Sequence, residues 1–461
     1  MASAPDPASV RETSGSASTA LDAVMHRAAE SGRLPGVSAA AFVKGRIEWS
    51  GTTGRTASQY RIGSITKTVT AVAVMQLRDE GRLDLADPLE RHIPEAPYGD
   101  RSIRSLLSHS SGMTAEPAGP WWERTHGVSW DELVTANASA RTVVAPGSRY
   151  HYSNLAFALL GELVGRLRGS GWHEAVMDKV LGPLGLDATT YQPSYNAAQG
   201  TSRDPLTGML MAEPATDTVA MAPAGQLWST IQDLARWGDF LVTGHRQVLS
   251  ASSLTEMRTV QSADPADQHV GGYGLGLRLR WLPTGTLVGH TGSMPGFLAG
   301  LFVDPRTRVG AVMLTNATTG VNPETVVLDL VMAAEATGVA TSDTDAADVA
   351  RDESAGPTGS AAEAEELRGT WYWGNTAMTL VPAQAGFFLR AAGTDLSFDC
   401  IDRDHYRGRN GYFTGEDLHV VRRDDRAVSH LEVVTFILTR RPYDPAAPIP
   451  GGIPAPVSWP G

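Results

Sequence analysis

The stretch that decides the fold is RIGSITKTVTAVAVMQLRDEG, residues 61–81, in which Ser64 and Lys67 stand three positions apart. Apolar and small residues lie on nearly every face of the helix that this stretch predicts, which is typical of a helix buried inside a protein. Gly81 stands where a glycine commonly ends a helix. Because residues i and i+3 share a helix face, the Lys67 ammonium can reach the Ser64 hydroxyl. The stretch therefore predicts a buried helix that begins with a paired serine and lysine.

This pairing makes Ser64 and Lys67 a candidate nucleophile and base. A serine hydroxyl is a weak nucleophile until a base takes its proton, and a lysine is a base only when neutral. Burial and the positive end of a helix both lower a lysine pKa. The chain has only three lysines, Lys44, Lys67 and Lys179, so 35 of its 38 basic residues (38 − 3) are arginines. A lysine kept on an apolar helix is costly unless it has partners or a task. The alternative is a surface lysine that follows a serine by chance.

A second motif, Tyr152-Ser153-Asn154, follows a turn at residues 146–148 and precedes an apolar helix. A tyrosine near a lysine can share proton transfer, and an asparagine amide can orient the lysine or a substrate carbonyl. The alternative is an aromatic residue beside a helix cap, and for Ser153 the cap is the better interpretation.

A third motif, His290-Thr291-Gly292-Ser293, ends a run of β pattern. A strand beside the nucleophile can offer one backbone N–H to an oxyanion, and the N–H of Ser64 can offer another. Ser293 is the candidate for the strand donor. Taken alone, His290 is more typical of a packed or hydrogen-bonded histidine than of a catalytic one.

The ordered set S-x-x-K, Y-x-N and H-T-G resembles the serine β-lactamase and penicillin-binding-protein superfamily, in its class C β-lactamase-like branch. The stretches RIGSITKTVTA, LLSHSSGM, PGSRYHYSN, LGLDATTY and GHTGSMPGF extend the resemblance over roughly residues 20–338. It implies that substrate acylates Ser64, that Lys67 and Tyr152 relay protons, and that Asn154 orients them. His290 takes the third-motif position, where the β-lactamases usually have lysine and certain carboxypeptidases and esterases have histidine. Hydrolysis of β-lactams is therefore less expected.

The predicted fold class is α/β (α+β), a β-lactamase/transpeptidase-like antiparallel sheet flanked by helices with a helical subdomain, followed by a small all-β barrel. Strand pattern flanks a turn near Lys44, helical pattern fills about 100–250, and β pattern returns from about 271. The expected organisation is a disordered leader (1–18), a catalytic domain (19–338), an acidic flexible linker (339–366), a lipocalin-like barrel (367–443) and an irregular tail (444–461).

The linker and barrel assignments rest on composition and alternation. The linker has eight Asp/Glu and one Arg, a net charge of −7 within a total of −12, and almost no large apolar residues. From Leu367, LRGTWYW looks like the start of lipocalin-like domains found behind some members of this superfamily. Such a domain could shape the substrate entrance, or it could serve stability alone.

The composition excludes several classes of function. An acidic chain lacks the basic surface of nucleic-acid or anionic-membrane binders, and no apolar run is long enough to span a membrane. The start of the chain has no secretory signal, which predicts a cytoplasmic protein. A single cysteine, Cys400, excludes an internal disulfide and favours a packed thiol. His109, His126 and His151 lack metal-site spacing, so neither metal nor cofactor is expected.

Two further residues are candidates for substrate binding. Trp122, beside Trp121 in a Pro/Gly loop, could line an apolar acyl pocket, although packing on the core explains it as well. Arg440, beside Arg441, could pair with a substrate carboxylate, although a solvated strand end is the more common case.

The sequence thus predicts a serine hydrolase or acyltransferase that acts on an ester, amide or thioester, either small or peptidyl, free or bound to a carrier protein. The lack of an export signal favours small esters, D-amino-acid peptides or carrier-bound peptidyl thioesters. The first alternative is a penicillin-binding-protein-type thioesterase that releases and macrocyclises nonribosomal peptides, since such enzymes pair this fold with a lipocalin-like domain. The second is a catalytically silent binding protein on the same fold, which need not have kept Ser64, Lys67 and Tyr152.

Overall fold

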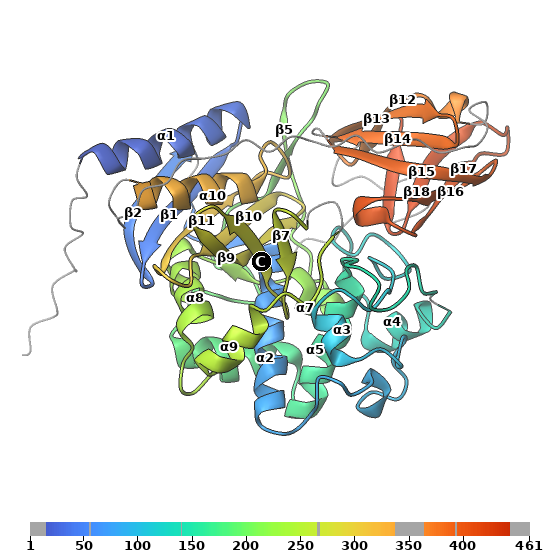
Figure 1. Ribbon diagram of the computed structural model, residues 1–461. Coiled ribbons are helices and arrows are strands. Elements are labelled where there is room, and N and C mark those ends of the chain that lie inside the picture. The colour runs from blue at the N-terminus through green and yellow to red at the C-terminus, as the bar shows by residue number, and fades with distance from the viewer. Residues whose placement is uncertain are drawn as a thin grey trace, which may run out of the picture.

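The computed structural model describes residues 15–54, 57–139, 141–264, 268–336, 364–391 and 394–442. Within these residues the chain forms a sheet-and-helix domain and a smaller barrel that lies against its helical part (Figure 1). No helix in the described residues is long and apolar enough to cross a membrane.

The central sheet has seven antiparallel strands in the order β2-β1-β11-β10-β9-β8-β7. They are Gly36–Val43 (β1), Arg46–Gly54 (β2), Gly271–Tyr273 (β7), Arg278–Leu282 (β8), Gly285–Met294 (β9), Phe297–Val303 (β10) and Val309–Thr315 (β11). Strands β10 and β11 are buried along their whole length, so the middle of the sheet is covered on both faces. The pairing of β1 with β11 brings the two ends of this domain together.

Helices cover both faces of this sheet. Helices α1 (Gly15–Ser31) and α10 (Pro323–Ala334) pack together over one face, and α8 (Ile231–Thr243) packs on the other (Figure 1). The other helices are α2 (Thr66–Asp79), α3 (Ile103–Leu107), α4 (Trp130–Ala136), α5 (Asn154–Arg168), α6 (Trp172–Val176), α7 (Ala222–Gly225) and α9 (Ala251–Met257). Most of them gather around α2, which lies inside the main hydrophobic core.

Shorter elements connect these parts. Two small sheets pair β3 (Tyr60–Arg61) with β6 (Trp228–Ser229) and β4 (Thr201–Arg203) with β5 (Leu210–Ala212). The 3-10 and π turns are Gly63–Ile65 (η1), Leu89–Arg91 (η2), Met177–Leu181 (η3), Gly182–Leu184 (η4), Val219–Met221 (η5), Glu365–Leu367 (η7) and Gly411–Phe413 (η8).

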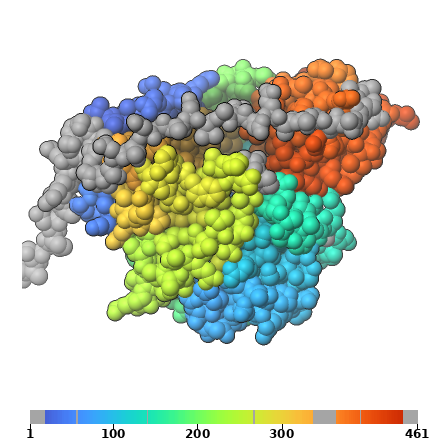
Figure 2. All heavy atoms as spheres, viewed as in Figure 1, coloured from blue at the N-terminus to red at the C-terminus, as the bar shows by residue number. Residues whose placement is uncertain are grey.

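The second domain is a closed antiparallel barrel of eight strands. Its strands are Gly369–Trp373 (β12), Thr376–Ala383 (β13), Gly386–Ala391 (β14), Thr394–Asp402 (β15), His405–Gly408 (β16), Asp417–Arg422 (β17), Val428–Val433 (β18) and Phe436–Thr439 (β19). Pairing of β12 with β19 closes the ring and removes the exposed edges of an open sheet. Figure 2 shows the barrel seated against the helical region of the first domain.

Trp121 joins the two domains. Its ring stacks on Trp373 of β12, with ring centroids 5.6 Å apart, and meets Phe436 of β19 edge to face. Trp121 therefore belongs to the hydrophobic core of the barrel although it comes from the first domain.

The predicted fold class is confirmed: an antiparallel sheet flanked by helices is followed by a closed β-barrel. One difference lies in the predicted leader, since residues 15–18 belong to α1, where the Ser18 hydroxyl bonds the Asp22 carboxylate one turn later. A second is at GYFTG, where the alternation predicts strand but Gly411–Phe413 forms the turn η8. The rest of the leader, nearly all of the linker and the tail lie outside the described residues.

Candidate active site

Ser64 and Lys67 lie at the start of the buried helix that the sequence predicts. Ser64 is in the turn η1, and α2 follows from Thr66. The Nζ atom of Lys67 donates to Ser64 Oγ at 2.9 Å, to Asn154 Oδ1 at 2.7 Å and to the Ala224 carbonyl at 2.6 Å. These three contacts use all three N–H groups of an ammonium. When the amine is neutral, its lone pair can instead accept the Ser64 hydroxyl proton.

Burial makes the neutral form of Lys67 accessible. The side chain is completely buried, and loss of hydration lowers the pKa of Lys67 to about 7, although the carboxyl groups of Glu116 and Glu123 oppose the shift. The amine is therefore near the midpoint of its titration at neutral pH, where a general base works best.

Tyr152 lies on the other side of Ser64, two residues before α5. Its hydroxyl hydrogen-bonds the Ser64 side chain, and the Lys67 Nζ atom lies 5.0 Å from its ring centroid. Burial raises the pKa of Tyr152 well above its usual value, and the hydrogen bond to Ser64 only partly opposes this. Tyr152 is therefore protonated at neutral pH and can relay a proton rather than abstract one.

Strand β9 and the turn that carries Ser64 meet at two glycines, Gly63 and Gly292. Gly63 has φ +51°, and a Cβ atom there would lie 2.6 Å from the Ser293 nitrogen. A Cβ atom on Gly292 would lie 1.9 Å from the Ile62 carbonyl oxygen. Both positions need glycine because the strand and the turn η1 touch backbone to backbone. This contact brings the Ser293 nitrogen next to the turn that carries Ser64, as a two-donor oxyanion hole requires.

His290 is buried and neutral. Its Nδ1 lies 2.5 Å from the Thr291 carbonyl oxygen, and its Nε2 lies 3.0 Å from the Tyr273 hydroxyl. A carbonyl only accepts, so Nδ1 carries the proton and Nε2 accepts from Tyr273. Burial, followed by the charge of Arg278, holds the pKa of His290 well below its usual value. His290 therefore supplies a neutral imidazole where a lysine would supply a charge.

These residues surround a cavity of about 420 Å³ that both domains line. Its lining includes Ser64, Tyr150, His151, Tyr152, Asp264, Arg278, His290, Thr291, Gly292, Ser293, Leu298, Asn322, Pro323, Gly411 and Tyr412. Thus Ser64, Tyr152, His290 and Ser293 meet at one cavity; Lys67 bonds Ser64 from behind it, and Asn154 bonds Lys67.

The two predicted substrate-binding residues are not in this lining. Trp122 is buried behind the site, where its indole N–H donates to Glu116 at 2.7 Å. The Arg440 guanidinium lies on the Trp371 ring, 3.9 Å from its centroid, and donates to backbone carbonyls of the barrel, including Glu366 and Arg368. Arg440 is therefore part of the barrel's own structure.

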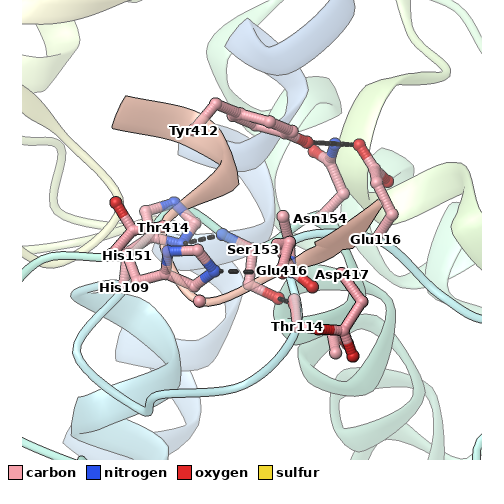
Figure 3. A network of polar contacts seen from close by, with 12 residues as sticks. His109, Thr114, Glu116, His151, Ser153, Asn154, Tyr412, Thr414, Glu416 and Asp417 are labelled. Atoms are coloured by element: carbon pink, nitrogen blue, oxygen red, sulfur yellow. Dashed lines mark hydrogen bonds and ion pairs between the residues drawn. The ribbon is translucent and has the colours of Figure 1, made fainter. Parts of the chain in front are cut away.

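Glu116 joins the two domains behind the site (Figure 3). Its Oε1 accepts from the Asn154 amide at 2.7 Å and from the hydroxyl of Tyr412 in the barrel turn η8, and its Oε2 accepts from Trp122. Burial, followed by the negative charge of Glu123, raises the pKa of Glu116.

Sequence reasoning missed Glu116, Arg278, Tyr412 and Glu416. None stands in a motif with a chemical spacing, and Tyr412 lies in a stretch whose alternation predicts a strand. In the sequence, Glu116 follows LLSHSSGM after two residues and Arg278 stands in a β run. Without the distances that the structure supplies, both resemble ordinary surface residues.

One group of metal-binding residue types occurs in the described part of the chain. His405, Asp417 and His419 lie on neighbouring barrel strands with ligand atoms within 4.8 Å of one another. Asp417 already pairs with Arg141 at 2.7 Å and Arg407 at 3.0 Å. Two guanidinium groups would compete with a cation there, and none of these three side chains lines the cavity.

Comparisons with known proteins agree with this geometry. Residues 21–336 match the Beta-lactamase family, and residues 360–440 match a domain family of unknown function, DUF7586. The chain is 33% identical over 247 residues to Protein Rv1367c of Mycobacterium tuberculosis, which covers 46% of this chain and 61% of that protein. It is 32% identical over 192 residues to the D-alanyl-D-alanine-carboxypeptidase/endopeptidase AmpH of Escherichia coli, covering 39% and 48%. It therefore spans less than two thirds of these relatives.

Among solved structures, a D-stereospecific amidohydrolase from Streptomyces sp. superposes with a TM-score of 0.59 and 27% identity. The match covers 70% of this chain and 99% of that one. The family match spans well over half of the sequence and includes all three motifs. The chain belongs to the Beta-lactamase family.

Proposed function

We propose that this chain is a serine hydrolase or acyltransferase that forms an acyl-enzyme on Ser64. The observation that carries the proposal is the 2.9 Å contact between Ser64 Oγ and the buried Nζ of Lys67, whose pKa is lowered to about 7. A surface lysine that follows a serine by chance would be hydrated and fully charged at neutral pH.

In the proposed reaction, Ser64 Oγ attacks the substrate carbonyl carbon while its proton passes to Lys67 Nζ, directly or through the Tyr152 hydroxyl. The backbone N–H groups of Ser64 and Ser293 stabilise the oxyanion. The bond to the leaving alcohol or amine then breaks, and the leaving group takes the proton back. In the second half, water or an amine attacks the acyl carbon and gives its proton to the same base; the bond between the acyl carbon and Ser64 Oγ then breaks, and the base returns the proton to Oγ.

We propose a small acyl donor with a D-amino-acid amide, peptide or ester bond. The cavity of about 420 Å³ suits a small substrate, and the barrel residues Gly411 and Tyr412 form part of its wall. The similarity to the Streptomyces amidohydrolase supports D-stereospecificity. Arg278 adds a guanidinium to the lining, with Nη1 3.5 Å from Thr291 Oγ1 and 3.0 Å from Glu324, and can pair with a substrate carboxylate.

Intact-mass spectrometry tests the acyl-enzyme. We expect an activated acyl ester or a penicillin to add one acyl mass to the wild type and none to Ser64→Ala. Absence of an adduct on the wild type with every reagent would support the silent binding protein instead. An adduct that persists on Ser64→Ala would overturn Ser64 as the nucleophile.

A substrate panel separates the remaining activities. It contains p-nitrophenyl esters, nitrocefin, D- and L-aminoacyl anilides, and a peptidyl thioester with a C-terminal D-residue. We expect turnover of D-aminoacyl anilides and short esters. Turnover restricted to short esters would overturn the D-aminoacyl assignment, and a cyclic product from the thioester would select the macrocyclising thioesterase.

A further inference from the structure

We infer that Tyr412 of the barrel and Glu116 are positioning residues of the Ser64–Lys67 site, and that they act by fixing the amide of Asn154. The inference rests on the proposed function, because it assigns to the barrel a part in arranging the same base. It makes the barrel a component of the active site in addition to a wall of the cavity.

The Asn154 side chain lies beside Glu116 and Tyr412 of the barrel (Figure 3), and both ends of its amide form hydrogen bonds. Its Oδ1 accepts from Lys67 Nζ at 2.7 Å. Its Nδ2 donates to Glu116 Oε1 at 2.7 Å and to the Tyr412 hydroxyl at 3.3 Å. The Tyr412 hydroxyl itself donates to Glu116 Oε1, so the three groups form a closed triangle of hydrogen bonds.

This triangle selects one of the two orientations of the amide. Glu116 Oε1 already accepts from the Tyr412 hydroxyl, so it carries no proton and takes the NH₂ end of Asn154, and the carbonyl end then faces Lys67. The flipped amide would turn its N–H groups toward the ammonium and its oxygen toward the carboxylate. A rotated amide would therefore lose its bonds on both sides and leave buried polar groups unpaired.

The barrel holds Tyr412 in place through neighbouring contacts. The Glu416 carboxylate accepts from the Ala115 backbone N–H at 2.6 Å and lies 3.2 Å from His151 Nε2. Arg141 donates to the Gly415 carbonyl at 2.9 Å and pairs with Asp417. These bonds span the interface on the residues just after the turn η8, so Tyr412 reaches Asn154 only when the barrel is docked.

The ring of Tyr412 also has a packing role that a test must preserve. It lies 6.1 Å from the ring of Tyr152 and 5.3 Å from Phe413, measured between centroids. Tyr412→Phe keeps these ring contacts and removes only the hydroxyl, so it isolates the hydrogen bonds.

The sign of the effect on Lys67 follows from the charges around it. The groups that act on the ammonium are the carboxyls of Glu116 and Glu123, and the neutral His109, Tyr152 and His290 lie on the adjoining segments. Removing the Tyr412 hydroxyl takes a donor from Glu116, which favours its neutral form, and loosens the Asn154 carbonyl. Both changes destabilise the ammonium, so the pKa of Lys67 should fall.

The shortage of lysine makes this shift directly measurable. With lysine labelled by ¹³C at Cε, the full chain gives signals from Lys44, Lys67 and Lys179 only, and Lys67→Met assigns the active-site signal. We expect Tyr412→Phe and Glu116→Gln to lower the titration midpoint of Lys67 by roughly half to one pH unit. Tyr372→Phe is the matched control, because it removes a barrel hydroxyl from a residue that does not line the cavity.

Kinetics supply the second readout. In Tyr412→Phe we expect the acylation rate on the high-pH plateau to fall about tenfold, as for a lost charge-assisted hydrogen bond. The acid limb of its pH profile should move in the same direction as the lysine titration. Tyr372→Phe should match the wild type in both measurements.

The outcomes distinguish the inference from the proposed function. If the wild type is acylated but the Lys67 midpoint and the pH profile of both Tyr412→Phe and Glu116→Gln match the wild type, the inference is wrong. If no substrate acylates the wild type, the proposed function fails, while the lysine titration, which needs no substrate, still decides whether Tyr412 and Glu116 set the state of Lys67.

Discussion

The two walls of the cavity are built in opposite ways. The first-domain wall pairs Ser64 with Lys67 over three residues of one helix start, at 2.9 Å. The barrel wall brings Tyr412 to Asn154 across 258 positions of sequence, at 3.3 Å. In the proposed function the local pair supplies the reactive groups, whereas the long-range contact bonds a side chain behind them. The proposed chemistry therefore depends on two residues that are close in sequence, and the alignment of the side chain behind them depends on the docking of the two domains.

The largest effect is expected when the proposed base of the first-domain wall, Lys67, is removed. We expect Lys67→Met to lower the acylation rate by about 10³-fold, because Ser64 then lacks a neighbouring proton acceptor. Stopped-flow measurement with an activated ester gives the rate. Lys179→Met, at an exposed lysine that pairs with Asp178, is the matched control and should behave as wild type. A near-normal rate in Lys67→Met would remove this lysine from the base system.

The pH dependence of the wild type tests the same wall without a mutation. The neutral amine is the reactive form, and the pKa of Lys67 is lowered to about 7, so activity should rise with pH through 7 and then level off. Below that midpoint kcat/KM should fall about tenfold per pH unit, since only the unprotonated fraction reacts. A profile that stays flat through neutral pH would contradict the lysine base.

Substitution of two arginines compares a residue of the cavity lining with a residue of the barrel that does not line it. Arg278 lines the cavity, whereas Arg440 is bonded within the barrel. We expect Arg278→Gln to raise KM about tenfold for substrates that carry a carboxylate, through loss of a charge-assisted pair, and to affect neutral esters much less. Arg440→Gln should leave KM unchanged for both. An equal effect of the two substitutions on carboxylate substrates would contradict this assignment.

The smallest effect on activity is expected at the interface itself. Glu416→Gln weakens the buried pair with His151 and should lower the free energy of unfolding by about 1–2 kcal/mol. It should reduce acylation less than Tyr412→Phe does, because it acts one step further from Asn154. Thermal unfolding measures the loss. Glu432→Gln is the control and should cost less, because the Glu432 carboxylate that pairs with the buried His430 is itself partly exposed to solvent.

Much of the local structure could be predicted from the sequence. The helix after Ser64, the hairpin around Lys44 and the strand that carries His290 follow from apolar periodicity and turn residues, and the structure has all of them. The barrel follows from alternation and turn signals, since no other arrangement of short strands buries one face without leaving edges.

The two substrate-binding candidates that do not line the cavity are residues whose place depends on partners far away in the sequence. Arg440 has the chemistry of a carboxylate ligand, yet its exposed guanidinium lies on Trp371 and donates to three backbone carbonyls of the same domain. Trp122 has a large apolar side chain that could line a pocket, yet it is buried in the core and its indole N–H donates to Glu116. In each case the residue type indicated what the side chain could bind, but the neighbouring sequence did not indicate which partner it contacts.

The sequence by itself determined the two domains, the helix that pairs Ser64 with Lys67, and the family to which these motifs belong. It could do so because helical and strand periodicities and i, i+3 spacing are local properties of the chain. Only the tertiary structure decided that His290 is neutral, that the lysine is buried to a pKa near 7, and that Tyr412 reaches Asn154. Burial, charge and amide orientation depend on which distant segments pack together, and no spacing in the sequence records that.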